Sequence, residues 1–170
     1  MCIVRLRTVA ISGLLLVACL ALGAYQEPHP LGQPPRLKFP KGIPQSARIA
    51  LLAGDFSLVT NVNELPSSVR RQFQEQGGTR LLIANPGEEF SATDVITNAS
   101  LPRQRLIFAG SSENATFVFY ERGGRGLSYV IDVFGIRSGE IAEPVWRGYC
   151  HQTVDNLDKL RREIVSGGCS

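Results

Sequence analysis

The chain has 170 residues, of which 44% are hydrophobic and 19% are charged, a composition typical of one ordinary globular domain. This composition excludes an intrinsically disordered protein and a multi-domain assembly. The formal net charge is +3, but removing Arg5 and Arg7 from the 18 basic residues leaves 16 against 15 acidic ones. We therefore expect no nucleic-acid partner.

Residues 1–23 have the layout of an export signal. Two arginines precede an apolar run over residues 8–22, and the small residues Gly23 and Ala24 follow it. The uninterrupted apolar stretch is shorter than the about 20 residues that span a bilayer core, which favours a cleaved signal over a membrane anchor. The sequence therefore predicts an exported protein.

Within this signal, Leu16-Val17-Ala18-Cys19 resembles the lipobox of bacterial lipoprotein precursors. The resemblance covers the signal alone, and it implies that Cys19 is lipidated and anchors the mature protein in a lipid bilayer. The absence of Asp after Cys19 is similar to the pattern of lipoproteins sent to the outer membrane. Leu20 is bulkier than the usual residue there, so ordinary cleavage near Ala24 stays open and would yield a secreted or periplasmic protein.

Residues 24–45 predict a proline-rich tether. Six of the ten prolines lie between Glu27 and Gln45, where fixed φ angles and missing N–H groups disfavour helix and sheet. In polyproline II form, at about 3.1 Å per residue, the segment would hold a domain up to about 60 Å from its anchor. The alternative is an extended arm laid against the domain.

The remaining residues, 46–170, predict a single α+β domain large enough to bury a core. Apolar, branched runs at residues 48–53 and 56–62, on either side of Gly54-Asp55, predict a β-hairpin. Pro66, with Val69 and Phe73 at helical spacing, predicts a helix over residues 66–76. A further strand is predicted over residues 79–84.

Residues 85–102 are polar and predict a long loop. Loops beyond about 12–15 residues often carry a function. Glu88, Glu89 and Asp94 crowd carboxylates into this loop, which could serve as acid and base or bind a partner. A solvated polar loop is the alternative.

The second half of the domain predicts a four-strand antiparallel meander followed by a helix. Apolar runs at residues 106–109, 115–121, 127–137 and 141–147 are separated by short turns. An apolar stripe over residues 154–166 predicts a helix that is N-capped by Thr153 and ends at Gly167-Gly168. The expected fold is a mostly antiparallel sheet packed with two helices.

Cys150 and Cys169 remain after processing as an even pair in an oxidising compartment, which predicts a disulfide. The bridge would close a loop of about 20 residues and add about 3 kcal/mol of stability. A Cys150 nucleophile paired with His151 is the alternative, although adjacent strand residues point to opposite faces.

Two pairs of residues in the meander are candidates for ligand or partner binding. Arg122 and Arg125 lie in a glycine-rich turn whose guanidinium and backbone N–H groups suit an anion. Trp146 and Tyr149 lie with Arg147 where the meander ends, and aromatic and Arg side chains are enriched at interface hot spots. A plain hairpin turn and core packing are the respective alternatives.

Asp132 lies between Val130 and Phe134 on one face of its predicted strand. An exposed outer face is one interpretation. The other is an ion pair in which Arg103 or Arg105 supplies the cation, because a carboxylate on an apolar face needs a partner.

No cofactor or metal is predicted, because the chain has only two histidines and none of the common nucleotide, zinc or nucleophile motifs. We predict a non-catalytic binding or structural module of the cell envelope, whose partner is an envelope protein or a cell-wall component. The alternatives are a secreted enzyme inhibitor and a small extracytoplasmic hydrolase. The hydrolase requires a pocket that joins the loop carboxylates to Asp132, whereas a flat meander face bearing Trp146 favours binding.

Overall fold

The computed structural model describes residues 42–75, 78, 80–95, 98–137 and 141–170. The predicted signal, Cys19 and most of the predicted tether lie outside these residues. The elements are α1 (Gln45–Ala53), β1 (Ser57–Val59), the 3-10 helix η1 (Val62–Glu64), α2 (Ser67–Arg71), β2 (Ile83–Ala84), β3 (Gln104–Ser111), β4 (Ala115–Arg122), β5 (Ser128–Arg137), β6 (Ile141–Cys150) and α3 (Leu157–Ser166). The predicted α+β class is confirmed.

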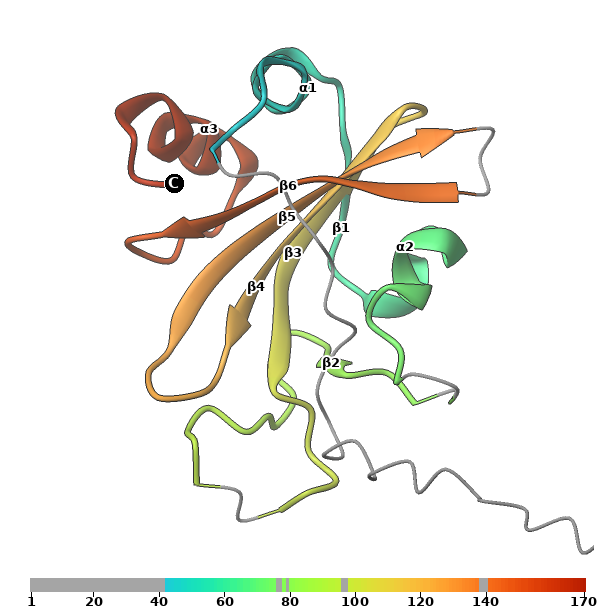
Figure 1. Ribbon diagram of the computed structural model, residues 1–170, viewed down its shortest axis with the longest axis vertical. Coiled ribbons are helices and arrows are strands. Elements are labelled where there is room, and N and C mark those ends of the chain that lie inside the picture. Colours follow the sequence, from blue (N-terminus) through green and yellow to red (C-terminus); the bar gives the residue numbers. More distant parts are fainter. Residues whose placement is uncertain (1–41, 76–77, 79, 96–97, 138–140) are drawn as a thin grey trace, which may run out of the picture.

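Four long strands form the predicted meander, in which β3, β4, β5 and β6 pair antiparallel in chain order. Two short strands lie on the other side of β3. β1 pairs antiparallel with residues 109–111, and β2 pairs parallel with residues 104–105. The sheet order is therefore β1-β3-β4-β5-β6, with β2 beside β1 along the same edge of β3 (Figure 1).

Both faces of this sheet are buried. Along β4, Phe117 and Phe119 pack in the core shared with α1 and α3, while Val118 and Tyr120 pack in the core shared with α2. All four side chains are 0% exposed. A strand covered on both faces has a near-continuous apolar sequence, as this one does. Burial of each phenylalanine contributes about 1.5–3 kcal/mol.

The predicted hairpin of residues 48–53 and 56–62 is wrong, because its first strand is part of α1. Ala47 and Leu51, one helical turn apart, are the buried residues of this helix and lie in the core shared with α3. The second segment contains only the short strand β1, which pairs with β3. Ile49 is the only β-branched residue in α1, and the alanines and leucines around it favour a helix, so the strand prediction overlooked the local helix propensity of this segment.

Arg161 of α3 completes the C-terminal end of α1. Its Nε donates a hydrogen bond to the Leu51 carbonyl (3.0 Å), and its Nη2 donates one to the Gly54 carbonyl (2.6 Å). The last carbonyls of a helix have no partner inside the helix. Arg161 thus ties the first and last helices together on one face of the sheet.

The predicted helix over residues 66–76 is shorter than expected, because α2 ends at Arg71. Val69 and Phe73 are both buried, as their spacing predicted. Beyond α2 the Leu82 N–H donates to the Phe73 carbonyl (2.7 Å), so the chain folds back on itself. The predicted strand over residues 79–84 is accordingly reduced to β2.

The C-terminal helix begins later than predicted. α3 starts at Leu157 with Asn156 as its N-cap, whose side chain accepts a hydrogen bond from the Lys159 N–H, so Thr153 is not the cap. The predicted end is confirmed, because Gly167 adopts a left-handed φ of 79°.

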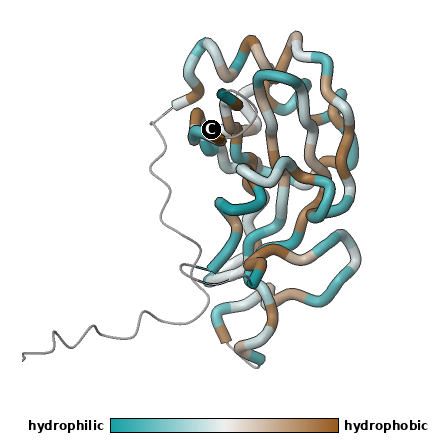
Figure 2. The backbone as a smooth tube through the Cα atoms, turned by 90° about the vertical axis from the view of Figure 1, so that its right-hand side faces the viewer, coloured by the Kyte–Doolittle hydropathy of each residue, from teal (hydrophilic) through white to brown (hydrophobic). Residues whose placement is uncertain are grey.

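The predicted disulfide is confirmed. Cys150 and Cys169 are bonded, with Cα atoms 4.0 Å apart. The residues beside the bridge also pair through their backbones, since Tyr149 and Ser170 exchange two hydrogen bonds of 2.8 and 3.1 Å. The tail of the chain therefore lies antiparallel beside the last residues of β6. α1 and α3 lie at one end of the molecule, and the loop before β3 lies at the other (Figure 1, Figure 2).

Candidate functional site

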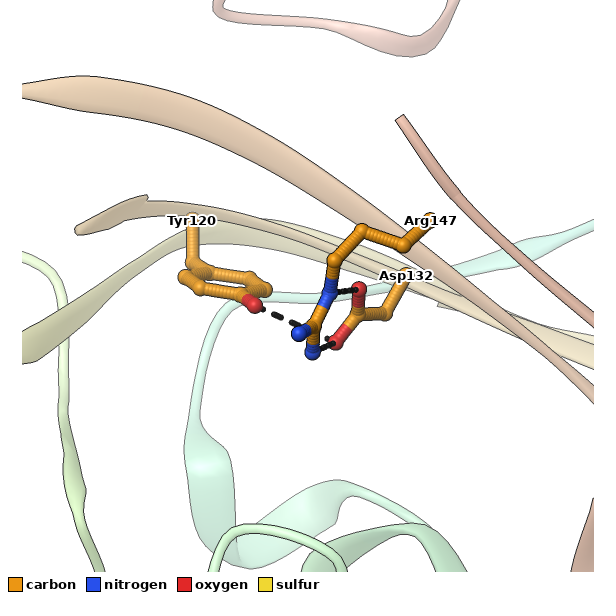
Figure 3. A network of polar contacts seen from close by, with 3 residues as sticks. All are labelled: Tyr120, Asp132 and Arg147. Carbon is orange, nitrogen blue, oxygen red and sulfur yellow. Dashed lines mark hydrogen bonds and ion pairs between the residues drawn. The ribbon is translucent and has the colours of Figure 1, made fainter. Parts of the chain in front are cut away.

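A buried polar network lies on the face of the sheet that α2 partly covers. Its members are Tyr120 on β4, Asp132 on β5 and Arg147 on β6 (Figure 3). Asp132 and Arg147 are direct cross-strand partners. Tyr120 opposes Val130, the neighbour of Asp132 two residues along on the same face. Three consecutive strands thus bring one phenol, one carboxylate and one guanidinium together.

The contacts of this network involve both carboxylate oxygens of Asp132. Arg147 donates from Nε to Oδ1 and from Nη2 to Oδ2, both at 2.6 Å. The Tyr120 hydroxyl donates to Oδ2 at 3.1 Å. The Asp132 side chain is 0% exposed, whereas that of Arg147 is 20% exposed. The guanidinium therefore leads from the buried carboxylate to the protein surface in a bidentate geometry.

Burial and charge act against each other in this network. Burial raises the pKa of the Asp132 carboxyl, and the hydrogen bonds and charge of Arg147 oppose that rise. Burial lowers the pKa of Arg147, but its hydrogen bonds to Asp132 and the charges of the neighbouring acidic groups together outweigh that effect and raise the pKa overall, so the guanidinium stays charged. Burial, followed by the neighbouring Asp132 charge, raises the pKa of Tyr120 well above its ordinary value. The phenol is therefore a neutral donor at physiological pH.

Two predicted binding residues lie on the same face as Arg147. Tyr149 is two residues along β6 and 45% exposed, and Arg122 is two residues beyond Tyr120 on β4 and half-buried. The positive charge of Arg122 acts on both Asp132 and Tyr120, which places its side chain near the network. We call Arg122, Arg147 and Tyr149 the arginine–tyrosine strip.

Trp146 does not belong to this strip, because the core-packing interpretation of this residue is confirmed and the exposed-face interpretation is wrong. Trp146 opposes Val133 and is 0% exposed in the core beneath α1 and α3. A Cβ atom at Gly148 would collide with the Trp146 ring, so the glycine leaves room for the indole. Trp146 is a core residue.

The ion-pair interpretation of Asp132 is confirmed, but neither Arg103 nor Arg105 supplies the cation. Arg105 instead pairs with Glu121 at 2.6 Å and lies 4.4 Å from the centre of the Phe90 ring. Sequence reasoning did not pair Arg147 with Asp132, because a β-bulge in β6 brings the arginine opposite the carboxylate.

Glu88 has a structural partner within its own loop. Its carboxylate accepts hydrogen bonds from the Asn85 backbone N–H (2.8 Å) and the Asn85 side-chain amide (3.1 Å), which lower its pKa. Asn85 Oδ1 in turn accepts a hydrogen bond from the Val62 N–H (2.8 Å). Gly87, with a φ of 80°, completes the turn. Glu88 thus holds the start of the loop against η1.

The other loop candidates are exposed. Glu89 and Asp94 lie at the surface of the loop, and Arg125 lies at the surface of the β4–β5 turn. The loop and the turn are joined by their backbones, because the Gly124 N–H donates to the Ala92 carbonyl at 3.3 Å. The structure therefore brings the predicted loop site and the predicted glycine-rich turn next to each other. Glu88 and Asp132, however, are engaged with separate partners.

Comparisons with known protein families, curated proteins and solved structures found no match to this chain. None of the helices within the described residues has the length and apolarity needed to span a bilayer. The described residues also contain no group of three or more His, Cys, Asp and Glu side chains placed to hold a metal ion.

Proposed function

We propose that this chain is an exported binding module of the bacterial cell envelope, tethered by a lipid on Cys19, and that it recognises an anionic group on its partner through the arginine–tyrosine strip. One observation carries the binding proposal. Asp132 is fully buried, and both of its oxygens are occupied in holding Arg147 beside Arg122 and Tyr149. Such an arrangement orients a cation at the surface.

Export is supported by the signal-like residues 1–23, by the lipobox resemblance at Cys19 and by the disulfide between Cys150 and Cys169. Disulfides persist in oxidising compartments and are rare in the cytosol. The proline-rich segment precedes α1 and would separate the domain from a membrane anchor.

The strip suits an anionic partner for three physical reasons. The two guanidinium charges of Arg122 and Arg147 exceed the single negative charge of Asp132 beside them. The Arg147 side chain is already fixed by Asp132, so binding costs less conformational entropy. Tyr149 adds an exposed ring with a hydroxyl group, which can contact apolar and polar groups together. An envelope protein or a cell-wall component with a carboxylate or phosphate group fits this chemistry.

The strip favours binding over hydrolysis. A general base needs an accessible carboxylate with a free lone pair near the substrate. Asp132 is inaccessible, and Glu88 is engaged with Asn85. The buried network therefore positions a cation and is poorly suited to accept a proton.

The export proposal is tested by the intact mass of the mature protein from the membrane and soluble fractions of a bacterial host. We expect a chain that starts at Cys19 and carries two or three acyl groups. An unlipidated chain starting near Ala24 would refute the lipid tether while keeping export. Retention of residues 1–22 would refute export itself.

The binding proposal is tested by photo-crosslinking in intact cell envelopes. A benzophenone amino acid at position 149 should form an adduct that disappears with Arg122→Gln. The same probe at Val165, 61% exposed on α3, should not form it. Arg137→Gln is the matched control, because this exposed arginine lies on β5 away from the strip. Equal adducts at both positions, or an adduct insensitive to Arg122→Gln, would refute the proposal.

A further inference from the structure

A cross-strand row of polar residues lies beside the buried network on the same face of the sheet. Gln104 on β3 opposes Arg122 on β4, and Arg122 opposes Ser128 on β5. Side chains of directly opposed residues start with Cβ atoms about 4.5–5.5 Å apart. We call these residues the Gln104 row.

One member of the Gln104 row has an unsatisfied buried acceptor, and another has no ion pair with a described residue. Gln104 is 2% exposed, and its buried Oε1 has no hydrogen-bond partner within the described residues. Arg122 forms no ion pair with any described carboxylate. A buried acceptor without a donor thus stands beside a cation without an anion. Buried polar groups without partners are uncommon in folded proteins, and each calls for an explanation such as a functional role or a bound water or ion.

We infer that the Gln104 row binds the free carboxyl end of a peptide, an inference that rests on the proposed binding function of the strip. Arg122 holds the terminal carboxylate, and Gln104 Oε1 accepts the hydrogen bond of the N–H on the same terminal residue. In the ligand, the terminal carboxylate and this N–H are attached to the same Cα atom and so lie close together. This spacing suits Arg122 and Gln104, whose side chains start from directly opposed strand positions.

The charges of the site favour a peptide carboxylate over phosphate. Arg122 and Arg147 together with Asp132 leave one net positive charge, which a single carboxylate neutralises. A phosphate monoester is largely dianionic at neutral pH, and neither it nor inorganic phosphate brings an amide donor to Gln104 Oε1. The peptide supplies both the anion and the donor.

The test is an NMR titration of the isotopically labelled mature chain with four probes. N-acetyl-dialanine carries both groups, its N-methylated form lacks the terminal N–H, its C-terminal amide lacks the carboxylate, and inorganic phosphate carries only charge. We expect N-acetyl-dialanine to shift the signals of Gln104, Arg122 and Ser128 and to bind about tenfold more tightly than each of the other probes. Equal binding of phosphate or of the N-methylated form would overturn the inference, as would the absence of any shift.

Variants separate this inference from the proposed function. Gln104→Met should abolish the preference for N-acetyl-dialanine over its N-methylated form while the adduct at position 149 persists. Arg122→Gln should weaken the binding of N-acetyl-dialanine by about tenfold, and Arg137→Gln should leave this affinity unchanged. If Gln104→Met retains both the preference for N-acetyl-dialanine and the crosslinked adduct at position 149, the peptide inference fails and the binding function of the strip stands. If Arg122→Gln changes neither the affinity for N-acetyl-dialanine nor the adduct, the peptide inference and the proposed binding function both fail. The N-methylated probe gives the same comparison on the unmodified protein.

Discussion

Arg147→Met should be among the most destabilising substitutions at a partly exposed position. The change keeps most of the aliphatic stem but removes the guanidinium, so the Asp132 carboxylate stays buried with only the Tyr120 hydroxyl as its donor. Breaking one side of a buried ion pair costs about 3–5 kcal/mol, because the remaining charge is uncompensated. The Arg147 side chain is 20% exposed, which places the expected loss at the lower end, about 3 kcal/mol.

Removing both charges should have a much smaller effect. Asp132→Leu combined with Arg147→Met replaces the pair with apolar side chains and leaves no buried charge. Such replacements are often neutral or stabilising. We expect the free energy of unfolding of the double variant to lie within about 1 kcal/mol of that of the unmodified protein. In a double-mutant cycle, the two substitutions should show a coupling energy of about 2–3 kcal/mol.

The measurement is urea-induced unfolding with the disulfide intact, analysed at constant m-value. Arg137→Met is the matched control in the same hairpin. Arg137 pairs with Glu143 at 3.1 Å, with side chains 75% and 46% exposed, so its loss should cost less than about 0.5 kcal/mol. If Arg147→Met costs no more than Arg137→Met, the buried network contributes nothing to stability and the reasoning is wrong.

Three further predictions concern other parts of the fold. Arg161→Ala should lower the free energy of unfolding by about 1–2 kcal/mol and speed amide exchange in α1, because two carbonyls lose a charged donor. Arg162→Ala, at the exposed neighbouring position, should do neither. Equal effects of the two substitutions would contradict the capping role. Tyr120→Phe should make stability less sensitive to alkaline pH. Burial raises the pKa of Tyr120, so above about pH 10 the phenol releases its proton in the unfolded chain but not in the folded one. The free energy of unfolding of the unmodified protein should therefore fall by up to about 1.4 kcal/mol per pH unit more than that of Tyr120→Phe. Urea unfolding at about pH 10–11 measures this, and an equal fall for both proteins would refute the prediction. Replacing Cys150 and Cys169 by Ser should lower the free energy of unfolding by about 3 kcal/mol. A reductant should lower the free energy of unfolding of the unmodified protein by the same amount. If neither treatment changes this free energy, the bridge is not stabilising.

Features set by neighbouring residues were predictable from the sequence. The meander followed from apolar runs separated by short turns, and the end of α3 followed from Gly167, which takes a left-handed backbone conformation easily. The Cys150–Cys169 bridge followed from counting cysteines. Each of these predictions depends on residues close in sequence or on a pair that has no other partner.

The position of α1 was not predictable in the same way. Its alanines and leucines favour a helix locally, but the helix is held in place by Ala47 and Leu51 in a core shared with α3 and by hydrogen bonds from Arg161. That arginine lies more than one hundred residues further along the chain. Contacts at such separation leave no periodic signal near the helix itself.

The candidate site shows where sequence reasoning ends. The sequence alone placed Asp132 between Val130 and Phe134 on one strand face, but it left open whether that face is exposed or the carboxylate is buried with a partner. Arg137 opposes Ile141 beside the β5–β6 turn, so an unbroken register would place Trp146 opposite Asp132. The bulge in β6 adds one residue, which turns Trp146 into the core beneath α1 and α3 and brings Arg147 to the carboxylate. Only the tertiary structure could decide this, because a one-residue shift exchanges the two faces of a strand and its position depends on packing from both sides.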